Sequence, residues 1–453
     1  MRSIFDASSN QILFYYLVVI IFFFHTLYKF RQDSFFVLIV FIFFMGLFVY
    51  AGKSVQNTYR ILTVLYAIYL MQRTVKMKTF SKDPLIIISF IFFSLTFLLS
   101  SFMNKDNFTL MFSQYSRYLL IFLFYFILLQ RMPNLMFQQK INQLLFRLIM
   151  IQILLSIVKM LVTGPMESIV GSLSFSGGAN AAVIPILGFV FLWMYRRGNL
   201  QKNDWFLILG LVFIGFVNYK RAIWFIMPFF IVLFLFYVQR RKINRYLLIL
   251  VILIPLIIYL GVRLNPTLNK EQKVWGSFDL KYALNYSRVY SFGNPEAREE
   301  QQVNVGRGGA MNYLFAKIVT GDLTKTDIFG KGLALMYVEG AKNEEYFVEQ
   351  YNINSIGSAS GFFQFYVVFG FLGTFSTLLF VFSLVRKIKN KRIQFALICM
   401  FFWEFFLYTG VMIREPALSF LFIYLIVYSN YLYLNPVYVK KTENLFEKQN
   451  KSI

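Results

Sequence analysis

Residues 84–102, PLIIISFIFFSLTFLLSSF, carry no charged side chain. A helix needs about 20 apolar residues to cross a hydrocarbon core of about 30 Å, so this stretch is long enough to span a membrane. Comparable apolar runs recur throughout the 453 residues, of which 58% are hydrophobic and 20% aromatic, and the mean hydropathy is +0.60. This composition excludes a water-soluble globular protein. The sequence therefore predicts an all-α, polytopic transmembrane protein.

The apolar runs predict about 13 membrane-spanning helices, with a range of about 12 to 14. The run at 58–72 is the least certain of them. The first run lacks a strongly basic start and an A-x-A-like exit, so we expect it to remain in the mature protein. The predicted spans are 11–28, 34–51, 58–72, 84–102, 109–130, 143–163, 181–195, 204–219, 221–238, 246–263, 361–385, 393–412 and 417–435.

Lys and Arg residues gather in the connections between the runs and give the chain a net charge of +24. A nucleic-acid-binding protein gathers its basic residues on one soluble face, so we expect no nucleic-acid partner. Cytoplasmic loops are enriched in Lys and Arg, and the connections do alternate in charge. This alternation predicts a cytoplasmic C-terminus and an external N-terminus, although one early span more or fewer would reverse the latter. Basic connections follow residues 72, 130, 195, 238 and 385, and nearly neutral ones lie around Lys105-Asp106, 163–180 and Arg414-Glu415.

One long hydrophilic stretch, residues 264–358, falls on the external side by this alternation. It holds 11 of the 21 acidic residues and 10 of the 45 basic ones, so it is nearly neutral. Loops of this length are usually functional or disordered, and its aromatic content favours a folded cap with short helices. We therefore divide the chain into N-terminal transmembrane helices (1–263), an extracytoplasmic loop or cap (264–358), C-terminal transmembrane helices (359–436) and a cytoplasmic tail (437–453).

The sequence lacks the residues that several kinds of chemistry require. The chain has one cysteine, Cys399, and one histidine, His25, so an intrachain disulfide is excluded and a zinc site is not expected. No Walker motif, HExxH motif or hydrolytic triad occurs. We expect any chemistry to be metal-independent and to need no cofactor.

Arg117, in FSQYSRYLLIF, lies well inside a predicted span. A charge within a bilayer is costly and is therefore a functional hypothesis by default. Two interpretations remain open: a structural pair with Glu404, which lies at a comparable depth in another span, or an arginine that binds an anion below the outer surface.

Lys220 and Arg221, in FVNYKRAIWF, occupy a very short connection that the charge alternation places outside. Positive charge is not needed there for orientation. Because guanidinium offers paired donors in fixed geometry, the pair suits a phosphate or diphosphate; the alternative is an interfacial pair that snorkels.

Arg307 and Asn180 complete the candidate residues. Arg307, in VNVGRGGAMNYLF, opens a predicted amphipathic helix after a glycine-rich turn, where free amides favour anions. Asn180, in SLSFSGGANAAVIPIL, starts a span, and its plainest role is that of a helix N-cap.

These segments occur in an order that resembles the O-antigen polymerase/ligase superfamily, which acts on polyprenyl-diphosphate-linked glycans. GGANAAVIPIL is similar to its Asn-Ala segment at the start of a span, and NYKRAIWF to its Ser-Arg-Gly/Ala segment, with Lys220 in place of Ser. Arg307 followed by Gly330 and Gly332 resembles the family's Arg and later Gly-x-Gly. SASGFFQFYVVFGFLG resembles a pattern ending in Gly-x-x-Gly, and the resemblance covers roughly residues 170 to 380.

One departure from the family concerns the base. Members often have His-Asn where this chain has Ala359-Ser360, and in ligases that histidine is the proposed base for the acceptor hydroxyl. The departure favours a polysaccharide polymerase over a lipid A-core ligase, by analogy. Candidate replacements nearby in sequence are Glu339, Glu344, Glu345 and Glu349.

The resemblance implies a glycosyltransferase of the bacterial cytoplasmic membrane that works in capsule, exopolysaccharide or O-antigen synthesis. A glycan on a polyprenyl diphosphate would be the donor, and a second lipid-linked repeat unit the acceptor. Arg221 and Arg307 would act on the departing diphosphate; Arg117, Asn180, Lys220, Gly330 and Gly332 would bind substrate. Membrane lipid, a flippase and a chain-length regulator are the implied partners. A flippase of lipid-linked oligosaccharides and a ligase of finished polymer remain as alternatives.

Overall fold

The computed structural model describes residues 9–49, 53–76, 79, 83–164, 170–173, 179–218, 220–238, 255–256, 258–292, 307–337 and 359–432. All regular structure in these residues is helical, and they contain no β-strand. The predicted all-α class is therefore confirmed for the described part of the chain.

Five of the described helices are long and apolar enough to cross a membrane. Their lengths run from 20 to 29 residues, against the roughly 20 residues that a bilayer core requires. The chain is thus a membrane-embedded helical protein. The five helices are α1 (Ser9–Phe30), α6 (Pro84–Met103), α7 (Phe108–Arg131), α8 (Leu135–Thr163) and α18 (Gly361–Val385).

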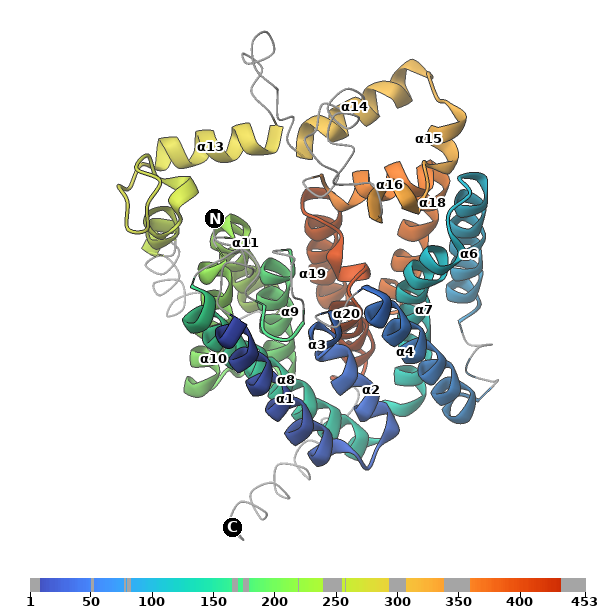
Figure 1. Ribbon diagram of the computed structural model, residues 1–453, viewed down its shortest axis with the longest axis horizontal. Coiled ribbons are helices and arrows are strands. Elements are labelled where there is room, and N and C mark those ends of the chain that lie inside the picture. The colour runs from blue at the N-terminus through green and yellow to red at the C-terminus, as the bar shows by residue number, and fades with distance from the viewer. Residues whose placement is uncertain are drawn as a thin grey trace.

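Shorter helices fill the space among these five. Two of them, α9 (Asn180–Tyr195) and α20 (Pro416–Ser429), are apolar on all sides, which is typical of helices surrounded by protein. Every residue of α20 is buried, and it packs against α7 and α9, so it forms the centre of the bundle (Figure 1). The others are α2 (Ser34–Phe43), α3 (Gly46–Val49), α4 (Lys53–Thr74), α10 (Lys202–Val217), α11 (Arg221–Val232) with its π-helical extension η2 (Leu233–Val238), and α19 (Lys391–Phe402).

The predicted spans coincide with described helices, with three differences. The span 34–51 is divided between α2 and α3, because the amide of Gly46 donates to the carbonyl of Ser172 instead of continuing the helix. The span 393–412 leaves regular helical geometry after Leu407. The span 246–263 lies largely outside the described residues.

Ion pairs tie the helices together at the end of the bundle where the basic connections gather, which we call the basic end. Asp83, before α6, contacts Lys387, after α18, and Asp33, before α2, contacts Arg131 at the end of α7. The carboxylate in each pair is a helix N-cap residue, where negative charge is favourable. These contacts fix the relative heights of the helices they join.

Short helices lie at the opposite end, across the direction of the long helices (Figure 1). They belong to the described part of 264–358, where the sequence predicted a cap with short helices. We call them together the cap. They are η3 (Pro266–Leu268), α13 (Leu280–Phe292), α14 (Arg307–Thr320), α15 (Lys325–Phe329) and α16 (Leu333–Tyr337).

The cap is joined to α18 by direct backbone contact. The amides of Lys331 and Gly332 donate to the carbonyls of Val367 and Val368 at 2.8 and 3.1 Å. These carbonyls are accessible because α18 is kinked at Gly370, which has a φ of 69°. Near the same turn, Asp106 accepts from the amides of Leu333 and Ala334 and so holds the start of α16 against the α6–α7 connection. The turn after α15 is therefore fixed on two sides.

Candidate functional site

A helix break within the bundle creates the most polar surroundings in its described interior. The π-helical turn η6 (Trp403–Leu407) follows α19, and Gly410 then adopts the left-handed conformation with a φ of 68°. A short 3-10 turn, η7 (Val411–Ile413), leads to Pro416, the first residue of α20. Non-helical backbone at membrane depth is tolerated only where protein or a water-filled cavity covers it, and such breaks often mark functional sites.

Arg414 satisfies the carbonyl oxygens that the break releases. Its Nε donates to the carbonyl of Gly410 at 3.2 Å, and Nη2 donates to the carbonyl of Thr409. Its Nη1 donates to Oε1 of Gln364 on α18 at 2.5 Å. The side chain is only 8% exposed, so the planar guanidinium holds η7 and α18 together from a buried position.

Glu404 supplies negative charge on the other side of the break. It is fully buried, and Arg414 is its principal favourable charge neighbour, with the amides of Gly410, Val411 and Met412 adding to the effect. None of these reaches either carboxylate oxygen with hydrogen-bond geometry in the described structure. The Glu404 carboxyl therefore interacts through space with the Arg414 guanidinium and with the backbone amides of the break, without a direct ion pair.

A second charge pair lies beside the first. Nη1 of Arg117, on α7, lies 3.8 Å from Oε1 of Glu415, the N-cap residue of α20. Arg117 is as buried as Arg414, at 8% exposed, whereas the Glu415 side chain is 27% exposed and Glu404 is fully buried. We call Arg117, Glu404, Arg414 and Glu415, together with Gln364, the charged cluster.

The heights of the two helices explain why this pair forms. Arg117 precedes Arg131, at the basic end, by fourteen residues, or about 21 Å of helix. Glu415 stands just before the fourteen residues of α20, whose C-cap Asn430 accepts the amide of Lys389 at the basic end. Both charges therefore lie about 21 Å from the basic end, or about 10 Å short of the far edge of a 30 Å core.

The structure changes the partner predicted for Arg117. We expected Glu404 as one possible partner, from its similar depth. The ion pair instead joins Arg117 to Glu415, and the guanidinium that faces Glu404 belongs to Arg414. The expectation failed because the break after Leu407 turns the chain before it can continue as a straight span.

Asn180 and Lys220 lie at helix starts near this region. Asn180 is the first residue of α9 and is buried, whereas the N-cap position is occupied by Ala179, so the predicted N-cap role is wrong. α9 packs directly on η7, which is part of the helix break. Lys220 is the N-cap residue of α11, and its amide donates to the carbonyl of Gly215 at 3.0 Å. The predicted tight connection between the two spans is therefore present.

The two predicted catalytic arginines each open a helix. Arg221 is the first residue of α11, and Arg307 is the first residue of α14 in the cap. Both side chains lie outside the described part of the structure. Their backbone positions agree with the predicted helix starts, and their roles stay predictions.

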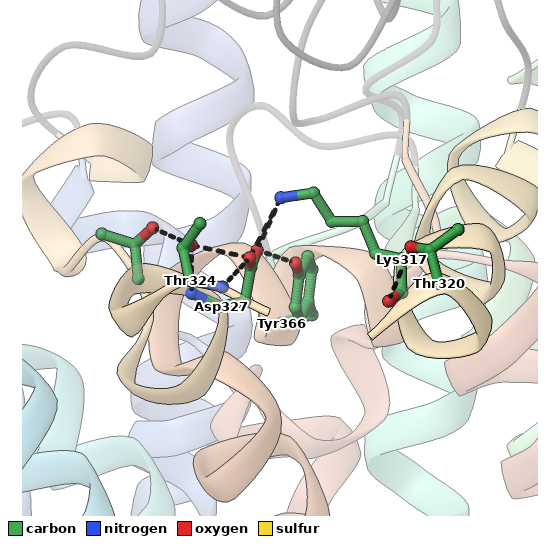
Figure 2. A network of polar contacts seen from close by, with 6 residues as sticks. Lys317, Thr320, Thr324, Asp327 and Tyr366 are labelled. Carbon is green, nitrogen blue, oxygen red and sulfur yellow. Dashed lines mark hydrogen bonds and ion pairs between the residues drawn. The ribbon is translucent and has the colours of Figure 1, made fainter. Parts of the chain in front are cut away.

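A polar network fixes the far end of the helix that Arg307 opens (Figure 2). Asp327 of α15 accepts from Nζ of Lys317, near the end of α14, at 3.0 Å, and from the hydroxyl of Tyr366 on α18. Its Oδ2 also accepts from the amide and the hydroxyl of Thr324, which completes a capping box. The network therefore connects α14 and α15 to α18 through one carboxylate.

The ionisation of Asp327 reflects these donors. Burial raises its pKa, but hydrogen bonds from Thr324, Tyr366 and Lys317 outweigh that effect and lower the pKa to about 2. Asp327 is consequently charged at any physiological pH, and the network stays closed.

Gly330 and Gly332 are structural residues of the turn after α15. Both have positive φ, 83° and 82°, and a Cβ on Gly330 would lie 2.2 Å from the carbonyl oxygen of Val368. A Cβ on Gly332 would lie 2.6 Å from the Cβ of Asn104. Their predicted substrate-binding role stays a prediction, while their role in docking the turn is visible.

Sequence reasoning missed Gln364, Arg414 and Glu415. The dipeptide Arg414-Glu415 was assigned to a neutral connection, because a straight span was expected to end just before it. The sequence offers no signal for Arg414 and Glu415, because charged residues between two apolar runs are ordinary; the structure shows that the helix after Glu415 has 14 residues, all of them buried.

The position at which this chain lacks the family's His-Asn adjoins the charged cluster. The amide of Gly361, next to Ser360, donates to the carbonyl of Tyr408 at 3.1 Å. Gln364 donates to the carbonyl of Ala359 and accepts from Arg414. The segment 359–361 is thus linked to the helix break by hydrogen bonds. The four glutamates proposed as replacements, Glu339, Glu344, Glu345 and Glu349, lie outside the described residues.

Comparisons with protein-family models, with curated proteins and with solved structures found no match for the chain. The described residues contain no group of three or more His, Cys, Asp or Glu side chains suited to hold a metal ion. What the cluster offers is guanidinium and carboxylate groups at the edge of an apolar interior, a combination suited to binding an anion and accepting a proton.

Proposed function

We propose that this chain is a polysaccharide polymerase that joins polyprenyl-diphosphate-linked repeat units at the outer face of the bacterial cytoplasmic membrane. The sequence resemblance described above supports it, together with the position of the charged cluster. In this proposal the protein crosses the membrane about 13 times, with the basic end and the C-terminal tail in the cytoplasm and the cap outside.

The observation that carries the proposal is the Arg117–Glu415 pair. If the basic end lies at the cytoplasmic edge of a core of about 30 Å, the pair would lie about 10 Å below the edge nearest the cap. A lipid diphosphate extends from the hydrocarbon region into the headgroup region. A cation at that depth is suited to its inner phosphate, and electrostatic attraction is strong there because water is scarce. A cap positioned over the same end is suited to a glycan that projects outward.

Some of these residues bind the substrate, and others stabilise the leaving group. Arg117 faces the inner part of the diphosphate. Arg221 and Arg307, each at the start of a helix, stabilise the negative charge that develops as the glycosyl bond breaks, with helix-start amides adding to the effect. Lys220 and Asn180 contribute further polar contacts. The leaving group is already activated, so the reaction needs neither nucleotide nor metal.

Deletion of the gene provides the test. We expect single lipid-linked repeat units to accumulate while long polymer disappears, when both are separated on gels and by mass. Retention of free long polymer without attachment would instead show a ligase. Arg221→Ala and Arg307→Ala should reproduce the deletion while the protein remains in the membrane at its normal amount.

A flippase for the same lipid-linked oligosaccharides is the second candidate. The specific observation in its favour is the broken helix between Leu407 and Pro416, since transporters commonly place substrate sites at such breaks. Repeat units trapped on the cytoplasmic leaflet after deletion, inaccessible to an external glycosidase, would support that function over polymerisation.

A further inference from the structure

A glycosyl transfer to a sugar hydroxyl needs a group that removes the hydroxyl proton. Carboxylates and histidines are the usual general bases, and such a base typically contributes about 10² to 10⁴ in rate. The chain's single histidine, His25, contacts Arg147 through its Nδ1, on α1 and α8. Both lie in the halves of these helices nearest the basic end, far in sequence and height from the cap. A carboxylate is therefore the remaining choice for the general base.

The described carboxylates nearest the cap are mostly committed to other contacts. Asp106 accepts from the amides of Leu333 and Ala334, and Asp327 is the centre of the network in Figure 2. Asp279 contacts Lys270, and Glu271 accepts from the amide of Ser277. Each of these contacts holds a local turn or helix start, so removing a carboxylate from it would disturb the cap.

The two carboxylates of the charged cluster differ in access. Glu404 is fully buried behind the helix break, whereas the side chain of Glu415 is 27% exposed. Glu415 is also 3.8 Å from Arg117, the cation that the proposed function assigns to the diphosphate. An ion pair of this length leaves room for both groups to turn toward a ligand, because direct charged hydrogen bonds are about 1 Å shorter.

We propose that Glu415 is the general base that takes the proton from the acceptor hydroxyl. This inference rests on the proposed function. Glu415 directly follows Arg414, which is joined through Gln364 to Ala359, so the backbone that carries the carboxylate adjoins the hydrogen-bonded unit that includes Ala359.

The proposed glycosyl transfer forms one C–O bond and breaks another. The acceptor hydroxyl oxygen attacks the anomeric carbon of the donor, and a new glycosidic C–O bond forms. The bond from that carbon to the diphosphate oxygen breaks, and its electron pair leaves with the polyprenyl diphosphate, next to Arg117. The hydroxyl proton passes to the Glu415 carboxylate and then to external water.

The competing explanation is that Glu415 only neutralises Arg117. The two explanations predict different kinetic effects. If Glu415 only neutralises Arg117, Glu415→Gln should change mainly KM for the repeat unit, because Arg117 is the residue assigned to the diphosphate. If Glu415 is the base, Glu415→Gln should lower kcat, and Arg117→Gln together with Glu415→Gln should be as slow or slower.

The assay uses full-length protein in lipid nanodiscs and lipid-linked repeat units extracted from the deletion strain. We expect Glu415→Gln to lower kcat by about 100-fold or more, with KM for the repeat unit changed less than threefold. Glu415→Asp should retain part of the turnover, and the acid limb of the wild-type pH–rate profile should be absent in Glu415→Gln. Asp322→Asn, at an exposed cap carboxylate outside the cluster, is the control and should match wild type.

The outcomes separate the inference from the proposed function. Wild-type polymerisation with normal turnover in Glu415→Gln overturns the base and leaves the polymerase standing, and so does recovery in the double variant. Absence of polymer formation by wild-type protein that binds the repeat units overturns both.

Discussion

Gly370 of α18 and Gly330 of the cap are in direct backbone contact: a Cβ on Gly370 would lie 2.5 Å from the amide nitrogen of Gly330. The two glycines are 40 residues apart in this chain. Their contact explains why glycine stands at both positions, since only residues without a Cβ allow α18 and the turn after α15 to approach this closely.

Alanine at either glycine should therefore detach the cap from α18. We expect Gly330→Ala and Gly370→Ala each to lower the free energy of unfolding by about 2–4 kcal/mol, from a strained positive φ plus the overlap of a methyl group with backbone. Thermal unfolding of the purified protein in detergent measures this. Gly321→Ala is the matched control, because Gly321 also has a positive φ, 74°, but nothing lies within 4 Å of its Cβ position. An equal loss in all three variants would contradict the packing explanation.

Acid should open the network around Asp327. Its pKa is lowered in the folded protein to about 2, so the carboxylate stabilises the fold above its unfolded pKa of about 4, and this contribution is lost as the pH falls from about 4 to 2. The protection of α14 and α15 from hydrogen exchange, relative to the intrinsic rate at each pH, should fall across that interval. In Asp327→Asn the protection should be low already at pH 6 and nearly independent of pH. Slow exchange of α15 in this variant at pH 6 would show that other contacts hold the cap.

We expect every replacement of Arg414 to lower the stability of the protein. Lysine carries the charge but cannot donate to Thr409, Gly410 and Gln364 at once. We expect Arg414→Leu to lower stability by about 3–5 kcal/mol, since the buried oxygens of Thr409, Gly410 and Gln364 would lose their charged donor. Arg414→Lys should lose less. Arg386→Lys, at an exposed position after α18, provides the control. Membrane yield and thermal unfolding are the measurements, and normal stability of Arg414→Leu would contradict the role assigned to the helix break.

Loss of the helix-start arginines should affect activity more than stability. Arg221→Ala and Arg307→Ala should each reduce polymer formation by about 100-fold or more, because each removes fixed positive charge from a developing diphosphate. Lysine at these positions should restore part of the rate. Arg288→Ala, on the exposed side of α13, should form normal polymer and is the matched cap control. Full-length polymer in both arginine variants would refute the site assignment.

Most helices could be predicted from the sequence because their cause is local. A run of apolar residues long enough for a bilayer forms a helix whatever it packs against, and the helices α1, α6, α7, α8 and α18 appear where the runs predict them. The break of 34–51 at Gly46 and the end of α19–η6 at Leu407 depend on Ser172 and Arg414, which are distant in sequence or in an adjoining turn. No hydropathy pattern contains that information.

The candidate site was predictable only in part for the same reason. Arg117 stood out because a charge inside an apolar run is costly wherever it lies. Glu415 did not, because a charge between two runs is ordinary, and only the tertiary structure places it at the depth of Arg117. The connection of Asp327 to Tyr366, which is 39 residues further along the chain, depends on tertiary contact and has no counterpart in the local sequence.

The burial of α20 has a consequence for how the protein is made. A ribosome delivers residues 416–429 to the bilayer after every other described helix, yet this segment occupies the middle of the bundle. Helices synthesised earlier therefore cannot reach their final packing until this segment is inserted. Premature termination before Pro416 would leave a protein without its centre rather than a slightly shortened one.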